Sequence, residues 1–335
     1  MIHQSFLLRD TVQLDARDAV LMLNSALDPL VQHAQLTIQG GTLTLAEDNV
    51  AAAEAVLSSS VKGVAVQHVA FHDYILHHAA GTMDVAAMNL LYQPGNVWMQ
   101  HGLQVALYAL RPGGRLYVTG AKDRGILSTA KRMQEYFGNV ETLQISKGQR
   151  VLCSRRRGGP YLPPPMQDVT VFAGSKLDDG TRLLLDALEV RATDEALDIG
   201  SGAGFIGLHI ARLANQGHVT LVDASLAAVD AAQRAVEQSG LANVLVLAGD
   251  GVQPVSQQRF DLVATNPPFH QGGIQTLEIA ERFIHGAAHV LRPQGRFYIV
   301  ANRFLKYEPI LHASFKQVEE VGGDTRYKVL RGLPL

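Results

Sequence analysis

The octapeptide Asp198–Phe205, DIGSGAGF, decides the fold of the second half of this chain, because it joins a short apolar strand to a helix. Glycines at 200, 202 and 204 allow a tight turn and let a ligand lie against backbone amides at the start of the helix. Apolar strands and helices alternate along this half, which predicts a parallel sheet covered by helices on both faces. The expected parallel strands are 196–199, 218–222, 244–248, 260–264 and 295–301. The expected helices are 180–188, 205–213, 225–239 and 276–291. An antiparallel pair of strands, 315–321 and 327–331, is expected to close the sheet.

The same pattern occurs twice in the 335 residues. Asn89 aligns with Asn266, 177 residues later, where the first copy reads MDVAAMNLLYQPG and the second reads FDLVATNPPFHQG. The later segments LRPGGRLYVTGAKDR and LRPQGRFYIVANRF match in the same order. The sequence therefore predicts an α/β protein of two tandem Rossmann-like domains that arose by duplication. Strands of the first domain are expected at 20–23, 43–45, 83–88 and 114–119.

Only the second copy keeps the glycine-rich loop. At the equivalent place the first copy reads Asn24-Ser-Ala-Leu-Asp, and the side chains of Leu27 and Asp28 prevent a ligand from approaching the backbone. We therefore expect the first copy to be degenerate and to bind no nucleotide cofactor. The stretch 155–165, RRRGGPYLPPP, can continue neither a helix nor a central strand. It predicts a degenerate domain over 1–157, a linker over 158–165 and a complete domain over 166–335.

The composition fits a soluble globular protein, with 47% hydrophobic and 18% charged residues. No apolar run reaches the ~18 residues of a membrane-spanning helix, and the N-terminus lacks the features of a secretory signal. A single cysteine, Cys153, excludes an intrachain disulfide and fits the reducing cytoplasm. Its apolar neighbours indicate a buried strand residue. The histidines at 68, 72, 77 and 78 have no cysteine partners, so we expect no metal site.

The net charge of −2 is unevenly distributed. Residues 84–157 hold eleven Lys and Arg against four Asp and Glu, a local charge of +7. This region ends in Arg155, Arg156 and Arg157, which form a candidate surface for RNA phosphates. The alternative is a solvated face followed by a charged linker.

Three acidic residues follow successive strands of the second copy and are candidates to bind a cofactor. Asp198 directly precedes the glycines, where a carboxylate favours the cationic amino group of S-adenosylmethionine over a pyrophosphate such as that of NAD. Asp223, nineteen residues after Gly204, is placed to accept hydrogen bonds from ribose hydroxyls, and Asp250 from an adenine amino group. The alternatives are purely local: Asp198 caps the loop, Asp223 caps a helix, and Asp250 forms a turn.

The segment Asn266-Pro-Pro-Phe follows the fourth strand and is the strongest candidate for catalysis. The Asn266 side-chain oxygen and the Pro267 carbonyl can both accept from one planar NH₂ group, which directs the nitrogen lone pair toward a methyl donor. Phe269 offers a face on which a flipped base can stack. The rate gain then comes from positioning and dipoles, without a strong base. A rigid turn without catalytic function is the alternative.

With these motifs, the second copy resembles a class I S-adenosylmethionine-dependent methyltransferase. The whole chain resembles the bacterial ribosomal RNA guanine-2-amino methyltransferases of the RsmC/RlmG type, through 171–181 (VFAGSKLDDGT), 266–272 (NPPFHQG) and 300–307 (VANRFLKY). The resemblance implies a degenerate N-terminal methyltransferase-like domain and a catalytic C-terminal one. It also implies methyl transfer to a guanine 2-amino group in ribosomal RNA, with the small-subunit branch preferred.

Three further residues near the catalytic loop are candidates to contact substrate. His270 follows Phe269, where it can line the pocket or contact an RNA phosphate, or equally hydrogen-bond the loop. Asn302 and Arg303 end the fifth strand on the same rim. The expected partner is ribosomal RNA or a ribosomal subunit, and the duplication favours a monomer. Other acceptors with a planar amine remain open, namely a large-subunit guanine, a protein glutamine or a DNA adenine. A non-catalytic RNA-binding assembly factor is the remaining alternative.

Overall fold

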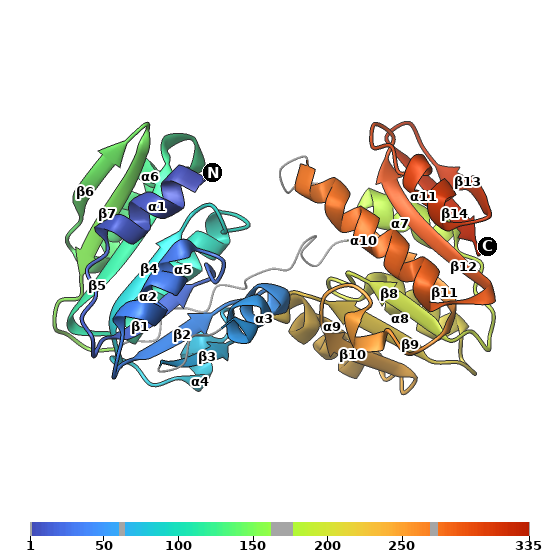
Figure 1. The fold of residues 1–335 in the computed structure, drawn as a ribbon. Helices are drawn as coiled ribbons and strands as arrows, with labels where there is room; N and C mark the ends of the chain where they lie inside the picture. The colour runs from blue at the N-terminus through green and yellow to red at the C-terminus, as the bar shows by residue number, and fades with distance from the viewer. Residues whose placement is uncertain (1, 60–63, 162–176, 269–273, 335) are drawn as a thin grey trace. The chain divides into compact units, whose positions relative to one another are not determined.

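The computed structural model describes residues 2–59, 64–161, 177–268 and 274–334. The chain divides into two compact units, Met1–Val169 and Thr170–Leu335. Each unit contains one seven-stranded sheet, and the two sheets have the same order of strands (Figure 1). The predicted fold class, an α/β protein of two tandem Rossmann-like domains, is confirmed.

The sheet of the first unit has the order β3-β2-β1-β4-β5-β7-β6. Its first five strands are parallel, whereas β7 is antiparallel to both β5 and β6. The strands are β1 (Ala19–Leu23), β2 (Thr42–Ala46), β3 (Ala65–Val69), β4 (Met83–Asn89), β5 (Leu110–Ala121), β6 (Glu141–Ser146) and β7 (Gln149–Arg155).

The sheet of the second unit repeats this topology as β10-β9-β8-β11-β12-β14-β13. Its parallel strands are again followed by an antiparallel pair at one edge. The strands are β8 (Ala196–Ile199), β9 (Val219–Asp223), β10 (Val244–Ala248), β11 (Phe260–Thr265), β12 (Leu291–Asn302), β13 (Gln317–Gly323) and β14 (Tyr327–Leu333).

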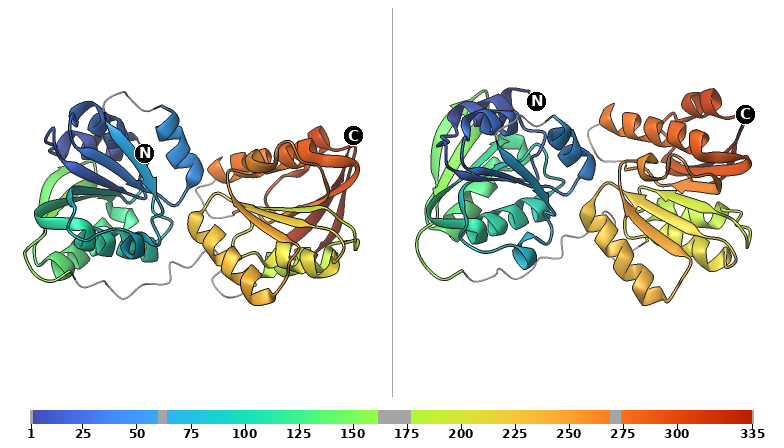
Figure 2. Two further views of the ribbon diagram at one scale, coloured as in Figure 1. Left: turned by 90° about the horizontal axis from the view of Figure 1, so that it is seen from below. Right: turned by 60° about the horizontal axis from the view of Figure 1, so that its bottom comes forward.

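Helices cover both faces of each sheet (Figure 2). Side-chain caps start several of them, such as Asp28 before α2, Asn49 before α3 and Ser225 before α9. In the first unit the helices are α1 (Ile2–Thr11), α2 (Pro29–Thr37), α3 (Val50–Ser58), α4 (Tyr74–His77), α5 (Asn96–Ala109) and α6 (Ile126–Phe137). In the second they are α7 (Asp179–Ala187), α8 (Phe205–Leu213), α9 (Leu226–Ser239), α10 (Ile274–Val290) and α11 (Glu308–Ser314).

The core of the second unit lies on both faces of its sheet, because side chains alternate along β8. Leu197 and Ile199 pack in one cluster with Phe283 of α10, whereas Ala196 packs in the other with Ile210 of α8. All five side chains are buried. The central strand is therefore fixed from both sides, and its carboxyl end holds the glycine loop in place.

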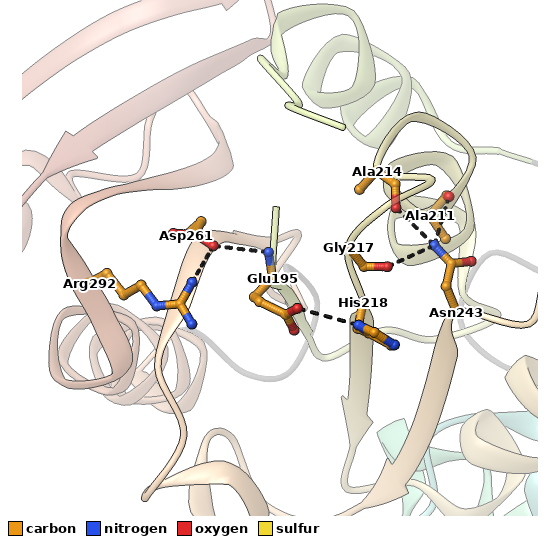
Figure 3. A network of polar contacts seen from close by, with 8 residues as sticks. All are labelled: Glu195, Ala211, Ala214, Gly217, His218, Asn243, Asp261 and Arg292. Carbon is orange, nitrogen blue, oxygen red and sulfur yellow. Dashed lines mark hydrogen bonds and ion pairs between the residues drawn. The ribbon is translucent and has the colours of Figure 1, made fainter. Parts of the chain in front are cut away.

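Polar side chains tie the amino ends of the second sheet together (Figure 3). The backbone N–H of Glu195 donates to Asp261 of β11 over 3.1 Å, and Arg292 of β12 forms an ion pair with the same carboxylate. Asn243, before β10, donates to three backbone carbonyls, those of Ala211, Ala214 and Gly217. These bonds lie at the edge opposite the glycine loop, so they brace the sheet without occupying its carboxyl edge.

The structure also contains strands β3 and β6, which the sequence did not predict, and it places Cys153 in β7, in agreement with the strand indicated around that residue. Contrary to prediction, Arg155 is the last residue of β7 and pairs with Arg115 of β5, so the irregular stretch begins after it. Cys153 of β7 is buried, as predicted, and burial raises the pKa of its thiol. The predicted linker, 158–165, lies partly outside the described residues.

Candidate active site

The loop between β8 and α8 is built on left-handed glycines. Gly200, Gly202 and Gly204 have φ values of +70°, +55° and +83°, which side chains with a Cβ rarely adopt. The backbone N–H groups of Gly200 and Ser201 donate to the Val222 carbonyl over 2.8 and 3.1 Å, so the loop is held beside the end of β9. These bonds fix the loop at the carboxyl edge of the sheet, where ligands bind in such folds.

Asp223 joins this loop to the helix that follows β9. Its Oδ2 accepts from the Gly202 N–H and its Oδ1 from the Ser225 N–H, each over 2.8 Å. The alternative that Asp223 caps a helix is therefore partly correct, because its carboxylate holds the start of α9. The carboxylate thus lies where β9 ends, beside the glycine loop and the start of α9.

Asp198 is completely buried at the end of β8. Its Oδ2 accepts from the Gly207 N–H over 2.9 Å, which ties β8 to the first turn of α8. Its Oδ1 has no hydrogen-bond partner within the described ranges. Burial raises the pKa of this carboxyl to about 7. Asp198 thus supports the loop through Oδ2, and its buried Oδ1 can accept a further hydrogen bond.

Asp250 lies at the same edge, after β10. The neighbouring Gly249 donates its N–H to the Asp223 carbonyl over 2.9 Å, which brings the two acidic loops together. The Asp250 carboxylate forms an ion pair with Arg282 of α10. That pairing holds the side chain against α10, and the carboxylate keeps lone pairs for a further donor.

Asn266 follows β11 and is half-buried. Its Nδ2 donates to the Thr181 hydroxyl over 2.8 Å and lies 3.4 Å from both carboxylate oxygens of Asp178. Its Oδ1 is buried without a partner among the residues that the structure describes. Asn266 therefore presents an unused acceptor at the carboxyl edge. The predicted site residues Phe269 and His270 lie outside the described residues.

Asn302 is the last residue of β12 on this carboxyl edge, and Arg303 directly follows it. Arg303 is exposed, but its guanidinium donates to Glu320 over 2.7 Å and to the Asp324 carbonyl, so it is bound to the β13–β14 hairpin. The next residue, Phe304, is 76% exposed. An aromatic ring so exposed beside the edge is a further candidate for contact with a base.

The three arginines of the predicted RNA surface differ in their surroundings. Arg155 and Arg157 are exposed, whereas Arg156 places its guanidinium 4.9 Å from the centre of the Tyr161 ring and donates to the Pro160 carbonyl over 3.2 Å. Arg156 therefore stabilises the chain segment after β7, and the other two remain available to a ligand.

The first unit closes the equivalent site with its own side chains. Asn89, at the position of Asn266, donates from Nδ2 to Asp28 over 2.7 Å and to Ser5 over 3.0 Å. Its Oδ1 accepts from Gln4 over 2.6 Å and from the Leu91 N–H over 2.9 Å. Asn89 is fully buried, and both ends of its amide are satisfied within the unit.

The loop framework is nevertheless shared by the two units. Asn24 stands where the second unit has Gly200 and adopts a left-handed φ of +46°, which asparagine tolerates better than most residues. Glu47 takes the place of Asp223, accepting from the Ala26 and Asn49 N–H groups over 2.9 and 3.1 Å. Burial raises the pKa of Glu47 to about 7. An acid after the second strand thus serves the scaffold in both units.

Comparison with known proteins places the chain in a family. A family model described as the methyltransferase small domain matches residues 166–331. The ribosomal RNA small subunit methyltransferase C of Pseudomonas entomophila is 31% identical over 278 residues, which cover 76% of this chain and 83% of that protein. The chain belongs to the ribosomal RNA small subunit methyltransferase C family. It is therefore a methyltransferase, as the sequence predicted.

Other members of the ribosomal RNA small subunit methyltransferase C family extend the match over both units. The protein from Shewanella pealeana is 28% identical over 348 residues, covering 92% of this chain and 98% of its own. The structure of the T. thermophilus 16S rRNA N2 G1207 methyltransferase, in complex with AdoMet and guanosine, has a TM-score of 0.86 and 29% identity. It covers 99% of this chain and 92% of that one.

Two groups at the site were not assigned any role from the sequence. Asp178 caps α7, and together with Thr181 it holds Asn266, although the two lie 88 and 85 residues away in the chain. An Asp directly before a helix is an N-cap signal that could have drawn attention to Asp178. In the described part of the chain, no cluster of three His, Cys, Asp or Glu could hold a metal, and no helix is long and apolar enough to cross a membrane.

Proposed function

We propose that this chain transfers the methyl group of S-adenosylmethionine to the exocyclic 2-amino group of a guanine in small-subunit ribosomal RNA. One observation carries the proposal. The Asn266 carbonyl oxygen is left without a partner among the described residues, whereas the carbonyl oxygen of Asn89 accepts two hydrogen bonds. An unpaired buried acceptor is costly, so its retention in one copy favours a ligand that completes it.

The residues at the carboxyl edge fit the proposed cofactor. The loop at Gly200–Gly204 has no side chain at its three left-handed positions, so a ligand can approach the backbone. Asp198 Oδ1 suits a cationic amino group, Asp223 suits the ribose hydroxyls, and Asp250 suits the adenine amino group. When bound, S-adenosylmethionine supplies a methyl carbon that is electrophilic because it is attached to a sulfonium.

The loop at Asn266 and Pro267 is proposed to hold the target amine. The Asn266 Oδ1 and the Pro267 carbonyl accept its two N–H hydrogens, which directs the nitrogen lone pair out of the base plane. Pro268 has no N–H and cannot compete for the same acceptors. The nitrogen becomes acidic as the new C–N bond forms, so the site needs orientation and aligned dipoles in place of a strong base.

The first unit is proposed to dock ribosomal RNA. Residues 84–157 carry a net charge of +7, and both Arg155 and Arg157 are exposed. Phosphate contacts of this kind position a nucleic acid without reading its sequence. A guanine is reached only when it is unstacked, so a docking unit in the same chain as the catalytic one is chemically reasonable. We further propose that the protein works as a monomer in the cytoplasm.

The proposal is tested by methylation of unmodified small and large ribosomal subunits with labelled S-adenosylmethionine, followed by nucleoside mass spectrometry. We expect N2-methylguanosine in small-subunit RNA. Free DNA and a glutamine-bearing release factor are included as alternative acceptors, and label in either would refute the proposal. Calorimetry tests whether the site binds S-adenosylmethionine. Absence of binding would favour the alternative of a non-catalytic assembly factor.

The substitution Asn266→Ala tests the role of the free acceptor. We expect turnover to fall by at least about 100-fold, the usual effect of removing one precisely placed polar group, with cofactor affinity nearly unchanged. Asn89→Ala is the matched control, because it removes the equivalent amide from the closed site. Near-wild-type turnover by the Asn266 variant would show that the assigned role is wrong.

A further inference from the structure

An asparagine amide is nearly symmetric in shape, so packing alone does not decide which end faces a substrate. In the proposed function Asn266 must present its oxygen, because an amine donates to a carbonyl and not to another NH₂ group. The structure places its Nδ2 against α7 and leaves Oδ1 free. Some other group must therefore select this orientation.

Thr181 of α7 selects it as a hydrogen-bond acceptor. The Thr181 hydroxyl donates to Asp178 Oδ2 over 2.6 Å, which directs its lone pairs toward Asn266. Asn266 Nδ2 then donates to that hydroxyl over 2.8 Å. Both oxygens of Asp178 also lie 3.4 Å from Nδ2, so only acceptors surround it on this side. Reversing the amide would place Oδ1 against these oxygens, which is repulsive.

The first unit gives an internal comparison. Its helix α1 occupies the place of α7, and Gln4 stands 177 residues before Thr181. Gln4 presents a donor, and Nε2 donates to Asn89 Oδ1 over 2.6 Å. The oxygen of the Asn89 amide therefore faces Gln4, whereas its Nδ2 donates to the neighbouring Ser5 and to Asp28. At this one helix position a donor meets the amide oxygen of Asn89, and an acceptor meets the amide nitrogen of Asn266.

We propose that Thr181, supported by Asp178, is a positioning residue that turns the Asn266 amide so that its oxygen faces the substrate amine. This inference rests on the proposed function and adds a residue to it. Thr181 itself is buried, with its N–H bound to Asp178 Oδ1 over 2.9 Å, so it acts through Asn266. Asp178 has two tasks, because it caps α7 with one oxygen and orients the Thr181 hydroxyl with the other.

The test compares Thr181→Val with Thr181→Ser. Valine keeps the shape of threonine and the backbone cap of α7 but lacks the hydroxyl, whereas serine keeps the hydroxyl. We expect kcat of the valine variant to fall about 30-fold, with KM for the RNA and Kd for S-adenosylmethionine changed less than about threefold. The serine variant should recover kcat to within about threefold of wild type.

Further measurements separate positioning from folding and from the proposed function itself. The Tm of each variant is measured, and the ratio of kcat is taken on the same small-subunit substrate as wild type. Equal kcat for valine and wild type would overturn the inference. So would equal loss in valine and serine together with lowered Tm or cofactor affinity, because that pattern indicates a structural role. Failure of wild type to methylate guanine would instead refute the proposed function.

Discussion

Replacing Asp198 by Asn should remove a pH-dependent loss of stability from the second unit. The carboxyl of Asp198 is completely buried, and burial raises its pKa to about 7 from an ordinary value of 3.8. The folded state therefore holds the proton more tightly than the unfolded state. The free energy of unfolding is highest when this group is protonated and falls as pH rises from about 4 to about 7.

The size of the effect follows from the two pKa values. A shift of about 3 units corresponds to about 4 kcal/mol over the whole titration, of which more than half falls between about pH 5 and pH 8. Asparagine can still accept from the Gly207 N–H through its own oxygen but does not ionise. Wild type should therefore lose about 2 to 3 kcal/mol more stability than Asp198→Asn over this interval.

Urea unfolding at several pH values measures this difference. Glu47, in the first unit, has a raised pKa for the same reason and contributes a loss of the same sign in both proteins. The unfolding curves of wild type and variant must therefore be compared with each other, and unfolding must be monitored by a probe in the second unit. Parallel pH profiles for the two proteins would refute the assigned burial effect. At pH 8 the variant should also bind S-adenosylmethionine more weakly, because the proposed partner of the cationic amino group has lost its charge.

Two further predictions concern the first unit. Asn89→Ala should lower the stability of that unit by about 3 kcal/mol, because the buried Oδ2 of Asp28 and the buried amide of Gln4 lose the bonds that Asn89 supplies. Cofactor affinity should stay unchanged, and an unaltered urea midpoint would contradict this prediction. Neutralising Arg155, Arg156 and Arg157 together should weaken RNA binding and reduce the slope of log K for RNA against log salt concentration by about 2. Arg156→Gln alone is the control, because the Arg156 guanidinium packs on Tyr161. An unchanged salt slope in the triple variant would assign these arginines to the linker.

Much of the fold could be predicted because apolar runs with clear boundaries determine it. The strands 196–199 and 244–248 agree with β8 and β10 to the residue, since glycines or polar residues delimit them. Strand β6 was missed because it is an edge strand whose side chains are mostly exposed and polar, so it carries no apolar signal. Strand β3 is another partly exposed edge strand.

The residues of the candidate site could be predicted only where the neighbouring sequence itself indicates their role. The glycines could be assigned because a left-handed turn needs them, and Asn266 because prolines follow it. The hydroxyl of Thr181 reaches Asn266 across 85 residues, and no local pattern encodes such a contact. The double role of Asp223, which holds both the Gly202 and Ser225 N–H groups, likewise depends on how the loops meet in space.

The hydrogen bonds around Asn89 bear on how the two copies diverged. Four partners from three separate segments now depend on this amide, and Asp28 among them is buried with a raised pKa. Asp28 is the one of these partners that lies in the first loop, so a glycine there would leave Asn89 Nδ2 without its carboxylate and the Leu30 N–H without its cap. Returning a glycine to that position therefore costs stability, which makes the specialisation of the two halves hard to reverse.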